Sequence, residues 1–327
     1  MALSFRHLIF RVSSDPKFGL GHINRCIELR KHLPNQCTWL LDNKTPKNLI
    51  ELIDSNDKII FENNYFSTRL LIYEMEKNNK AISIIDGYNF DFKYLEKLKE
   101  RIVCFSDNII SPKVRLVINP QPGAVAKEGI LAGIDYLIVD QSFLKKKPKK
   151  LSLKINYPIP LLISFGGVDS LNLTNKVAKC ILNDKSLKHI FLPTCLIPKN
   201  FKHLESLKKL KMLHESLNIL KGVKNIIELS GQFHIAIGGA GISQSERILA
   251  GIATLLIPQN KHHEDIVKEW EKIGCAIACS TDPKKIIESL KKLIAKNMFL
   301  ARSIIKNGQQ TVDGKGVIRV AEEILKI

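Results

Sequence analysis

Long apolar runs are missing from this sequence, and aromatic residues are few. No run approaches the roughly 20 apolar residues that span a bilayer. Residues 1–12 are interrupted by Arg6, His7 and Arg11, so they lack the apolar core of a secretory signal. Aromatic residues make up 7% of the chain, which leaves little for base-stacking surfaces. We therefore expect a cytoplasmic protein with neither stable membrane insertion nor a nucleic-acid partner.

Cysteine is also sparse, and its pattern gives no framework for disulfides or a metal. The 7 cysteines are an odd number scattered along 327 residues, which is typical of a reduced protein that uses cysteine as a small apolar residue. Cys275 and Cys279 have the spacing of half a metal site, but no second cysteine pair accompanies them. His262 and His263 precede two acidic residues and are better explained as part of a helix start. We expect no metal and no cofactor.

Positive charge predominates. Lysine and arginine number 50 against 32 aspartates and glutamates, which gives a net charge of +18. The excess is mostly lysine spread along the chain, and only residues 145–150 form a basic run. This distribution is typical of a solvated surface, and it also steers a small polyanion such as a nucleotide toward a binding site.

Short β-branched apolar runs alternate with longer helical stretches, which is typical of parallel sheets covered on both faces. The length predicts two domains, and the alternation restarts after a lysine- and proline-rich segment at 145–160. We therefore predict α/β domains at 1–150 and 151–327, with ligands bound in a cleft between them. The final helix is a candidate to pack back on the first domain. The predicted strands are 8–12, 37–41, 58–61, 81–85, 102–105, 116–118, 136–139, 161–164, 189–192, 226–229, 235–238, 254–257 and 276–278.

The first predicted strand is followed by a glycine-rich turn that opens a helix. Gly19 and Gly21 allow a tight turn and a close approach to a ligand, and the helix start offers N–H groups to an anion. His22 suits a general base, because the positive end of a helix dipole favours a neutral imidazole. Arg25 shares its helix face. From residue types alone, a base and a space-filling histidine explain His22 equally well.

Two more glycine-rich turns occur in the second half. Gly166 and Gly167 end its first predicted strand and precede Asp169, which also suits a helix N-cap. The turn at 238–243 follows another predicted strand and opens a helix whose start can hold a diphosphate. Glu246, one turn into that helix, is placed to accept hydrogen bonds from ribose hydroxyls.

These motifs together resemble the PseG family. The resemblance rests on Gly-x-Gly-His-x-x-Arg at 19–25, Gly-Gly-x-Asp at 166–169, and the turn at 238–243 with Ser245-Glu246 and Pro258-Gln259-Asn260 behind it. Other landmarks, such as Ile85-Asp86-Gly87-Tyr88, extend it over nearly the whole chain. The second half also resembles the donor-binding half of the glycosyltransferase MurG. The implied fold is of the GT-B type, with two Rossmann-like parallel-sheet domains facing a central cleft.

The resemblance also implies roles for individual residues. His22 corresponds to the family's catalytic histidine, Asn260 to its active-site asparagine, and Glu246 to the residue at the ribose. Asp86 suits orientation of His22 or sugar binding, and equally the capping of a turn. The other candidates for substrate binding are Gly19, Gly21, Arg25, Tyr88, Gly166, Gly167, Asp169, Gly239, Ala240, Gly241, Ile242, Ser243, Ser245 and Gln259.

The chain departs from the family pattern at Ser13, Asp140 and Val168, where the family has an acidic, a basic and a hydroxyl-bearing residue. These departures concern the identity of the sugar more than the reaction type.

The implied activity is metal-independent hydrolysis of UDP-2,4-diacetamido-2,4,6-trideoxy-β-L-altropyranose or a close relative, in the pathway to pseudaminic acid, a nonulosonic acid of flagellin glycosylation. Water attacks the anomeric carbon and inverts it, and UDP leaves. One alternative is a MurG-type glycosyltransferase that uses a UDP-sugar donor. Another is a non-catalytic protein that binds a nucleotide sugar or a nucleic acid. The oligomeric state is open.

Overall fold

The computed structural model describes residues 6–16, 19–34, 36–62, 68–87, 92–106, 113–145, 156–167, 169–223 and 225–327. The chain divides into two compact units, Met1–Asp140 with Gly314–Ile327, and Gln141–Asp313. Tyr88 and Val168 lie outside the described residues. Among the helices that are described, none combines the length and the apolar character that a bilayer crossing requires.

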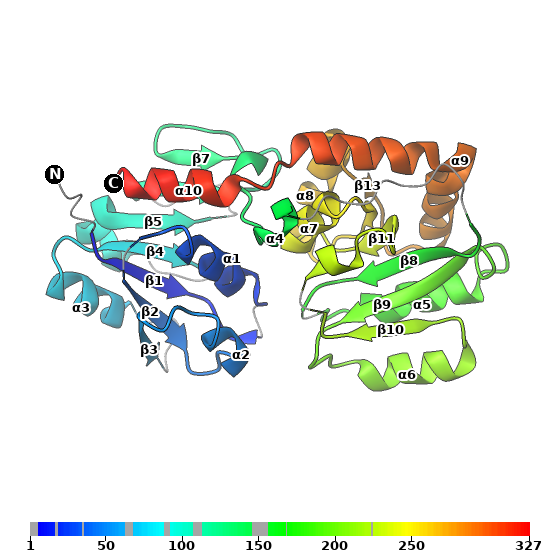
Figure 1. The fold of residues 1–327 in the computed structure, drawn as a ribbon, viewed down its shortest axis with the longest axis horizontal. Coiled ribbons are helices and arrows are strands. Elements are labelled where there is room, and N and C mark those ends of the chain that lie inside the picture. The colour runs from blue at the N-terminus through cyan, green and yellow to red at the C-terminus, as the bar shows by residue number, and fades with distance from the viewer. Residues whose placement is uncertain are drawn as a thin grey trace. The chain divides into compact units, whose positions relative to one another are not determined.

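The first unit is built on a parallel sheet of 7 strands in the order β3-β2-β1-β4-β5-β6-β7 (Figure 1). The strands are β1 (Leu8–Val12), β2 (Cys37–Asp42), β3 (Lys58–Glu62), β4 (Ile82–Asp86), β5 (Ile102–Phe105), β6 (Leu116–Asn119) and β7 (Ile130–Ala132). The strand order reverses between β1 and β4, which pair from Leu8 with Ile82 to Val12 with Asp86. In an open α/β sheet, this switch point is where ligands bind beyond the carboxyl ends of the strands.

Both faces of this sheet are apolar, because alternate residues of each strand point to opposite sides. Phe10 packs with Ile23 of α1 and Val320 of α10, whereas Ile9 packs on the other face with Leu71 of α3. Helices therefore cover both faces, which positions α1 directly behind β1. The helical segments are α1 (Gly21–Arg30), α2 (Lys47–Ile50), α3 (Arg69–Lys77), η2 (Phe92–Arg101), η3 (Ile134–Tyr136) and α10 (Gly316–Leu325).

The second unit repeats this plan with a parallel sheet of 6 strands in the order β10-β9-β8-β11-β12-β13. The strands are β8 (Ile159–Ser164), β9 (Phe191–Ile197), β10 (Asn218–Lys221), β11 (Ile235–Gly238), β12 (Ala253–Leu256) and β13 (Ile277–Ala278). Its switch point lies between β8 and β11, where Ser164 pairs with Gly238. The helical segments are α4 (Ser142–Lys145), α5 (Leu173–Asn183), α6 (Leu204–Leu213), η4 (Ile226–Leu229), α7 (Ile242–Leu249), α8 (Lys261–Lys272) and α9 (Pro283–Thr311).

The predicted strand at 136–139 is wrong. The chain forms η3 and then runs beside α10, where Gly316 lies so close to the backbone of Leu137 that a Cβ would collide with it. Arg319 of the same helix donates from Nη1 to the carbonyl oxygen of Asp135 at 3.0 Å. This segment therefore packs on a helix, and β7 forms the edge of the sheet instead.

The predicted strand at 226–229 is also wrong, because these residues form the 3-10 helix η4. The side chain of Asn225 accepts a hydrogen bond from the N–H of Ile227 at 3.0 Å and starts a helical turn. One edge strand of this sheet is β10, which the sequence analysis did not predict. Helix α9 runs to Thr311, with an interruption of the helical backbone at 295–298.

Candidate functional site

The switch point of the first unit brings together side chains from α1 and β4. His22 and Arg25 lie in the first turns of α1, and Asp86 is the last residue of β4. The chain leaving β1 bonds to the same strand end, because the N–H of Ser13 donates to the carbonyl oxygen of Asp86 at 2.8 Å. Three of the predicted site residues therefore meet at the carboxyl edge of this sheet.

The imidazole of His22 lies against the carboxylate of Asp86, with 2.7 Å between Nδ1 and Oδ1. Because an ionised carboxylate only accepts hydrogen bonds, Nδ1 must carry a proton. A neutral ring in this tautomer has its lone pair on Nε2. The His22 side chain is 10% exposed and that of Asp86 is fully buried, so the carboxylate lies on the inner side of the ring. This pairing fixes the orientation of the imidazole, as the aspartate of a catalytic triad does for its histidine.

The guanidinium of Arg25 makes a bidentate contact with the carboxylate of Asp86. Its Nε lies 2.5 Å from Oδ2 of Asp86, and its Nη2 lies 2.5 Å from Oδ1. The guanidinium also lies 4.6 Å from the ring centre of Phe105. Burial alone raises the pKa of Asp86, but the charges and hydrogen bonds of Arg25 and His22 lower it to about 2. Asp86 is therefore an anion at neutral pH.

The loop between β1 and α1 is shaped by glycine and by a residue that the sequence analysis missed. Gly19 has a φ of 89°, which favours glycine, and Gly21 is the first residue of α1. Asp42, at the end of β2, accepts hydrogen bonds from the N–H groups of Ser14 and Asp15 at 3.0 and 3.2 Å. Its position as an acidic residue at the end of a buried strand was the available signal.

At the switch point of the second unit, the predicted glycine turns leave two neighbouring strands. Gly166 and Gly167 are exposed residues two and three positions beyond the end of β8, and the other turn begins at Gly238. Gln259 links the two turns, since its Nε2 donates to the carbonyl oxygen of Phe165 at 3.0 Å. A Cβ on Gly239 would lie 2.5 Å from the Oε1 of Gln259, so this link requires glycine there.

Gly241 differs from Gly239, because neither its backbone nor its neighbours require glycine. Its φ is −73°, and a Cβ placed on it would meet no atom within 4 Å. As the N-cap residue of α7, it has no side chain to cap the first N–H groups of the helix, which lack partners inside a helix. An exposed glycine with open space at a helix start is typical of a site that an anion approaches closely.

The other predicted residues around this turn have varied surroundings. Ala240 and Ser245 are buried, whereas Ile242, Ser243 and Glu246 are partly exposed on the first turns of α7.

Asp169 and Asn260 cap helices. Asp169 is buried and accepts hydrogen bonds from the N–H groups of Leu173 and Thr174 at 2.8 and 2.9 Å, in the first turn of α5. Asn260 is exposed, and its Oδ1 accepts a hydrogen bond from the N–H of His263 at 2.9 Å in α8. A side-chain amide oxygen has two lone pairs, so this cap leaves one lone pair of Oδ1 and the Nδ2 donor for a ligand.

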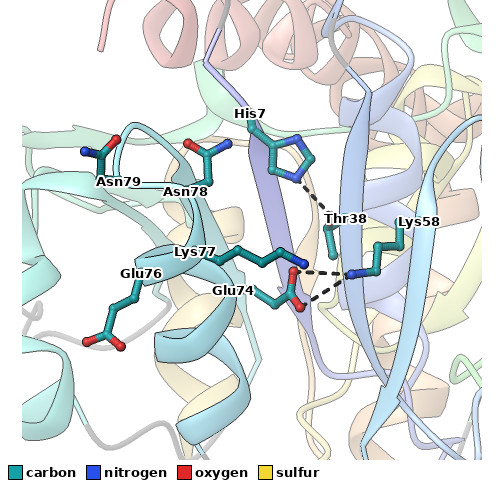
Figure 2. Close-up of a pocket in the computed structure, with 8 residues that line it drawn as sticks. All are labelled: His7, Thr38, Lys58, Glu74, Glu76, Lys77, Asn78 and Asn79. Carbon is teal, nitrogen blue, oxygen red and sulfur yellow. Dashed lines mark hydrogen bonds and ion pairs between the residues drawn. The ribbon is translucent and has the colours of Figure 1, made fainter.

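A cavity of about 580 Å³ in the first unit lies away from these residues. His7, Thr38 and Lys58 line it at the amino ends of β1, β2 and β3 (Figure 2). His22 and Asp86 lie at the opposite edge of the sheet. Among its charged groups, Lys58 and Glu74 form an ion pair at 3.5 Å. Across the described ranges, no group of three or more histidine, cysteine, aspartate or glutamate side chains is arranged to hold a metal ion.

No protein-family model matches the chain. It is 24% identical over 255 residues to the UDP-2,4-diacetamido-2,4,6-trideoxy-beta-L-altropyranose hydrolase of Campylobacter jejuni, which covers 74% of this chain and 88% of that protein. It is 23% identical over 322 residues to the spore coat polysaccharide biosynthesis protein SpsG of Bacillus subtilis, covering 92% and 93%. An uncharacterized protein of Methanocaldococcus jannaschii is 27% identical over 280 residues, or 78% of this chain, which spans about half (56%) of that protein.

Solved structures of similar fold cover almost the entire chain. MurG of Acinetobacter baumannii superposes with a TM-score of 0.70 at 14% identity, over 98% of this chain and 100% of that one. The UDP-GlcNAc 2-epimerase of Neisseria meningitidis, bound to UDP-GlcNAc, gives 0.65 at 14% identity over 98% and 99%. At these identities the similarity shows the fold alone. The chain has two α/β domains with wholly parallel sheets, of the GT-B class, which confirms the predicted fold class.

Proposed function

We propose that this protein is a cytoplasmic hydrolase of nucleotide sugars. The observation that carries the proposal is the contact of His22 with Asp86, which presents an oriented base at the switch point of the first unit. In the proposed reaction a water oxygen attacks the anomeric carbon. The bond from that carbon to the diphosphate oxygen breaks with its electron pair leaving on the diphosphate, and the anomeric centre inverts.

His22 is the general base in this proposal. Its Nε2 takes a proton from the attacking water, while Asp86 holds the Nδ1 proton and stabilises the imidazolium that forms. Nucleoside diphosphate is already a good leaving group, so no strong acid is needed at the departing oxygen. Arg25 keeps Asp86 ionised and fixed, which makes it a positioning residue rather than a catalytic one.

The nucleotide would be held by the turns of the second unit. The open space at Gly241 and the N–H groups at the start of α7 suit a diphosphate. Glu246 is partly exposed on the same helix and is assigned to the ribose. Asn260 is assigned to positioning the sugar or the water through its side-chain amide, whose Oδ1 also caps α8.

Two similar proteins support the choice of substrate class. The Campylobacter jejuni relative is named for the hydrolysis of a UDP-linked diacetamido-trideoxyhexose, and a neighbour in fold was solved with UDP-GlcNAc. We therefore assign UDP-2,4-diacetamido-2,4,6-trideoxy-β-L-altropyranose or a close relative as substrate, with its product used for pseudaminic acid. No metal is assigned a role, because a general base and a good leaving group complete the chemistry.

The proposal is tested by incubating the purified protein with UDP- and GDP-linked diacetamido-trideoxyhexoses in the absence of any acceptor. We expect rapid release of nucleoside diphosphate and a free sugar identifiable by NMR. Tight binding of the nucleotide sugars with no turnover under any condition would refute an enzymatic role.

A glycosyltransferase is the second candidate, since MurG of Acinetobacter baumannii and the spinosyn rhamnosyltransferase SpnG, with a TM-score of 0.69 to this chain, share the fold. A glycosyltransferase would bind the nucleotide sugar at the same turns of the second unit but pass the sugar to an acceptor other than water. Negligible nucleotide release without an acceptor, and rapid release once a sugar or lipid acceptor is added, would favour this candidate.

A further inference from the structure

Arg247 packs against the glycine turn of the second unit from inside the protein. Its side chain is 0% exposed. Its Nη2 donates to the carbonyl oxygen of Gly239 at 2.5 Å, and its Nη1 donates to the hydroxyl of Ser243 at 3.2 Å. A Cβ on Gly238 would lie 2.9 Å from Nη1, so only glycine lets the guanidinium pack this closely. One side chain therefore braces the turn and the first turn of α7 together.

The partners of this guanidinium are all neutral. Its remaining hydrogen bonds go to the amide of Gln244 and the hydroxyl of Thr254. Within the part of the chain that the structure describes, no carboxylate forms an ion pair with it. By contrast, the buried Arg11 pairs with Glu62 at 3.1 Å, and Arg25 pairs with Asp86.

A buried cation without a counter-ion is unfavourable, and proteins normally pair or neutralise such groups. Burial lowers the pKa of Arg247 to about 10, and the attraction of Glu246 only partly offsets this effect. Even so, the guanidinium is protonated at neutral pH. A positive charge therefore lies behind the turn, and no carboxylate of the described residues forms an ion pair with it.

We propose that the diphosphate of the substrate is the counter-ion of Arg247, and that Arg247 is a positioning residue that makes affinity depend on phosphate charge more than on the nucleoside. This inference rests on the proposed function, which assigns the diphosphate to the turn at 238–243. Arg247 acts through the carbonyl of Gly239 and the hydroxyl of Ser243, which it holds in place. It also adds a fixed positive potential to the N–H groups at the start of α7.

The test compares the affinities of UDP, UMP and uridine, measured by calorimetry, in wild type, Arg247→Met and Arg11→Met. We expect Arg247→Met to weaken UDP binding by roughly 10- to 100-fold, a range typical of contacts with charged groups. The affinity for UMP should fall less, and the affinity for uridine should not change. Arg11→Met removes a buried arginine that already has a carboxylate, so it should leave the ratios of the three affinities unchanged. Equal weakening of all three ligands by Arg247→Met would indicate a merely structural role and overturn the proposal.

Two further measurements keep the proposal testable if Arg247→Met does not fold. Arg247→Lys retains the charge and should restore most of the preference for UDP over uridine. On the wild-type protein, inorganic pyrophosphate should displace UDP more effectively than inorganic phosphate, and failure of pyrophosphate to compete would overturn the proposal.

The outcomes also separate this inference from the proposed function. A protein that shows the charge dependence but releases no UDP from any nucleotide sugar refutes the hydrolase and leaves the role of Arg247 intact. A protein that hydrolyses the sugar while Arg247→Met keeps the wild-type ratio of UDP to uridine affinity refutes the role of Arg247 alone.

Discussion

Nδ1 of His22 lies 2.7 Å from Oδ1 of Asp86, although the two residues are 64 positions apart in the chain. The contact exists because β1 and β4 are neighbours in the sheet, so that the helix after β1 starts beside the end of β4. The carboxylate determines which ring nitrogen carries the proton.

Asp86→Asn should lower the rate of nucleotide release by roughly 10²–10⁴-fold, because an amide no longer secures the Nδ1–H tautomer or stabilises the imidazolium. Affinity for UDP should stay near the wild-type value. The matched control is Asp57→Asn. Asp57 also accepts two hydrogen bonds from one arginine, Arg30, at 2.7 and 2.8 Å, but it precedes β3 at the opposite edge of the sheet. Equal rates in the two variants would contradict the role assigned to Asp86.

Asp86 should also make stability depend on pH in the acid range. Its pKa is about 2 in the folded protein against 3.8 as the ordinary value, so its contribution is complete above about pH 4 and is lost as the pH falls through about 2. The difference corresponds to about 2 kcal/mol. We expect the gap in free energy of unfolding between wild type and Asp86→Asn, measured by urea denaturation, to shrink by about that amount from pH 5 to pH 2. A constant gap would contradict the assignment.

Two glycines of the second unit should respond differently to alanine. Gly238→Ala forces a Cβ against the carbonyl oxygen of Ser164 and against Arg247, so thermal or urea unfolding should show a loss of about 1–3 kcal/mol. Gly241→Ala meets no atom, so stability should change by less than about 0.5 kcal/mol. Calorimetry should nevertheless show weaker UDP binding by Gly241→Ala, because the methyl group fills the space assigned to the diphosphate. Unchanged UDP affinity in Gly241→Ala would contradict the assignment of the diphosphate to this turn.

Water attack at the anomeric carbon predicts where oxygen from the solvent goes. In ¹⁸O-labelled water, the released UDP should carry no label, as read by mass spectrometry, because the bond between the sugar carbon and oxygen is the one that breaks. The first-formed sugar should have the inverted anomeric configuration by NMR. Label in the terminal phosphate of UDP would show attack at phosphorus and contradict the mechanism.

Much of the fold follows from local patterns in the sequence. The predicted strands at 8–12, 102–105 and 235–238 have the observed bounds, because buried apolar runs bounded by loops leave few alternatives. The segments at 136–139 and 226–229 fail for reasons that lie outside any local window. One packs on α10, which follows nearly 180 residues later, and the other is drawn into a helical turn by the side chain of Asn225.

The sequence likewise predicts only part of the candidate site. Glycine spacing indicates all three turns and places His22 and Arg25 at a helix start. The sequence indicates orientation of His22 as one of several roles for Asp86 but does not decide among them, because the contact depends on which strands are neighbours. It also does not single out Arg247, whose significance lies in complete burial among neutral partners. The role of Asn260 stays a prediction, with helix capping as the contact observed in the structure.

The most direct test of the central claim compares His22→Ala with wild type in a UDP-release assay, alongside UDP affinity measured by calorimetry. His32→Ala, a histidine just beyond the same helix, is the control. The account predicts a loss of turnover of roughly 10²–10⁴-fold in His22→Ala, with UDP affinity retained and His32→Ala fully active. Wild-type turnover in His22→Ala would contradict it.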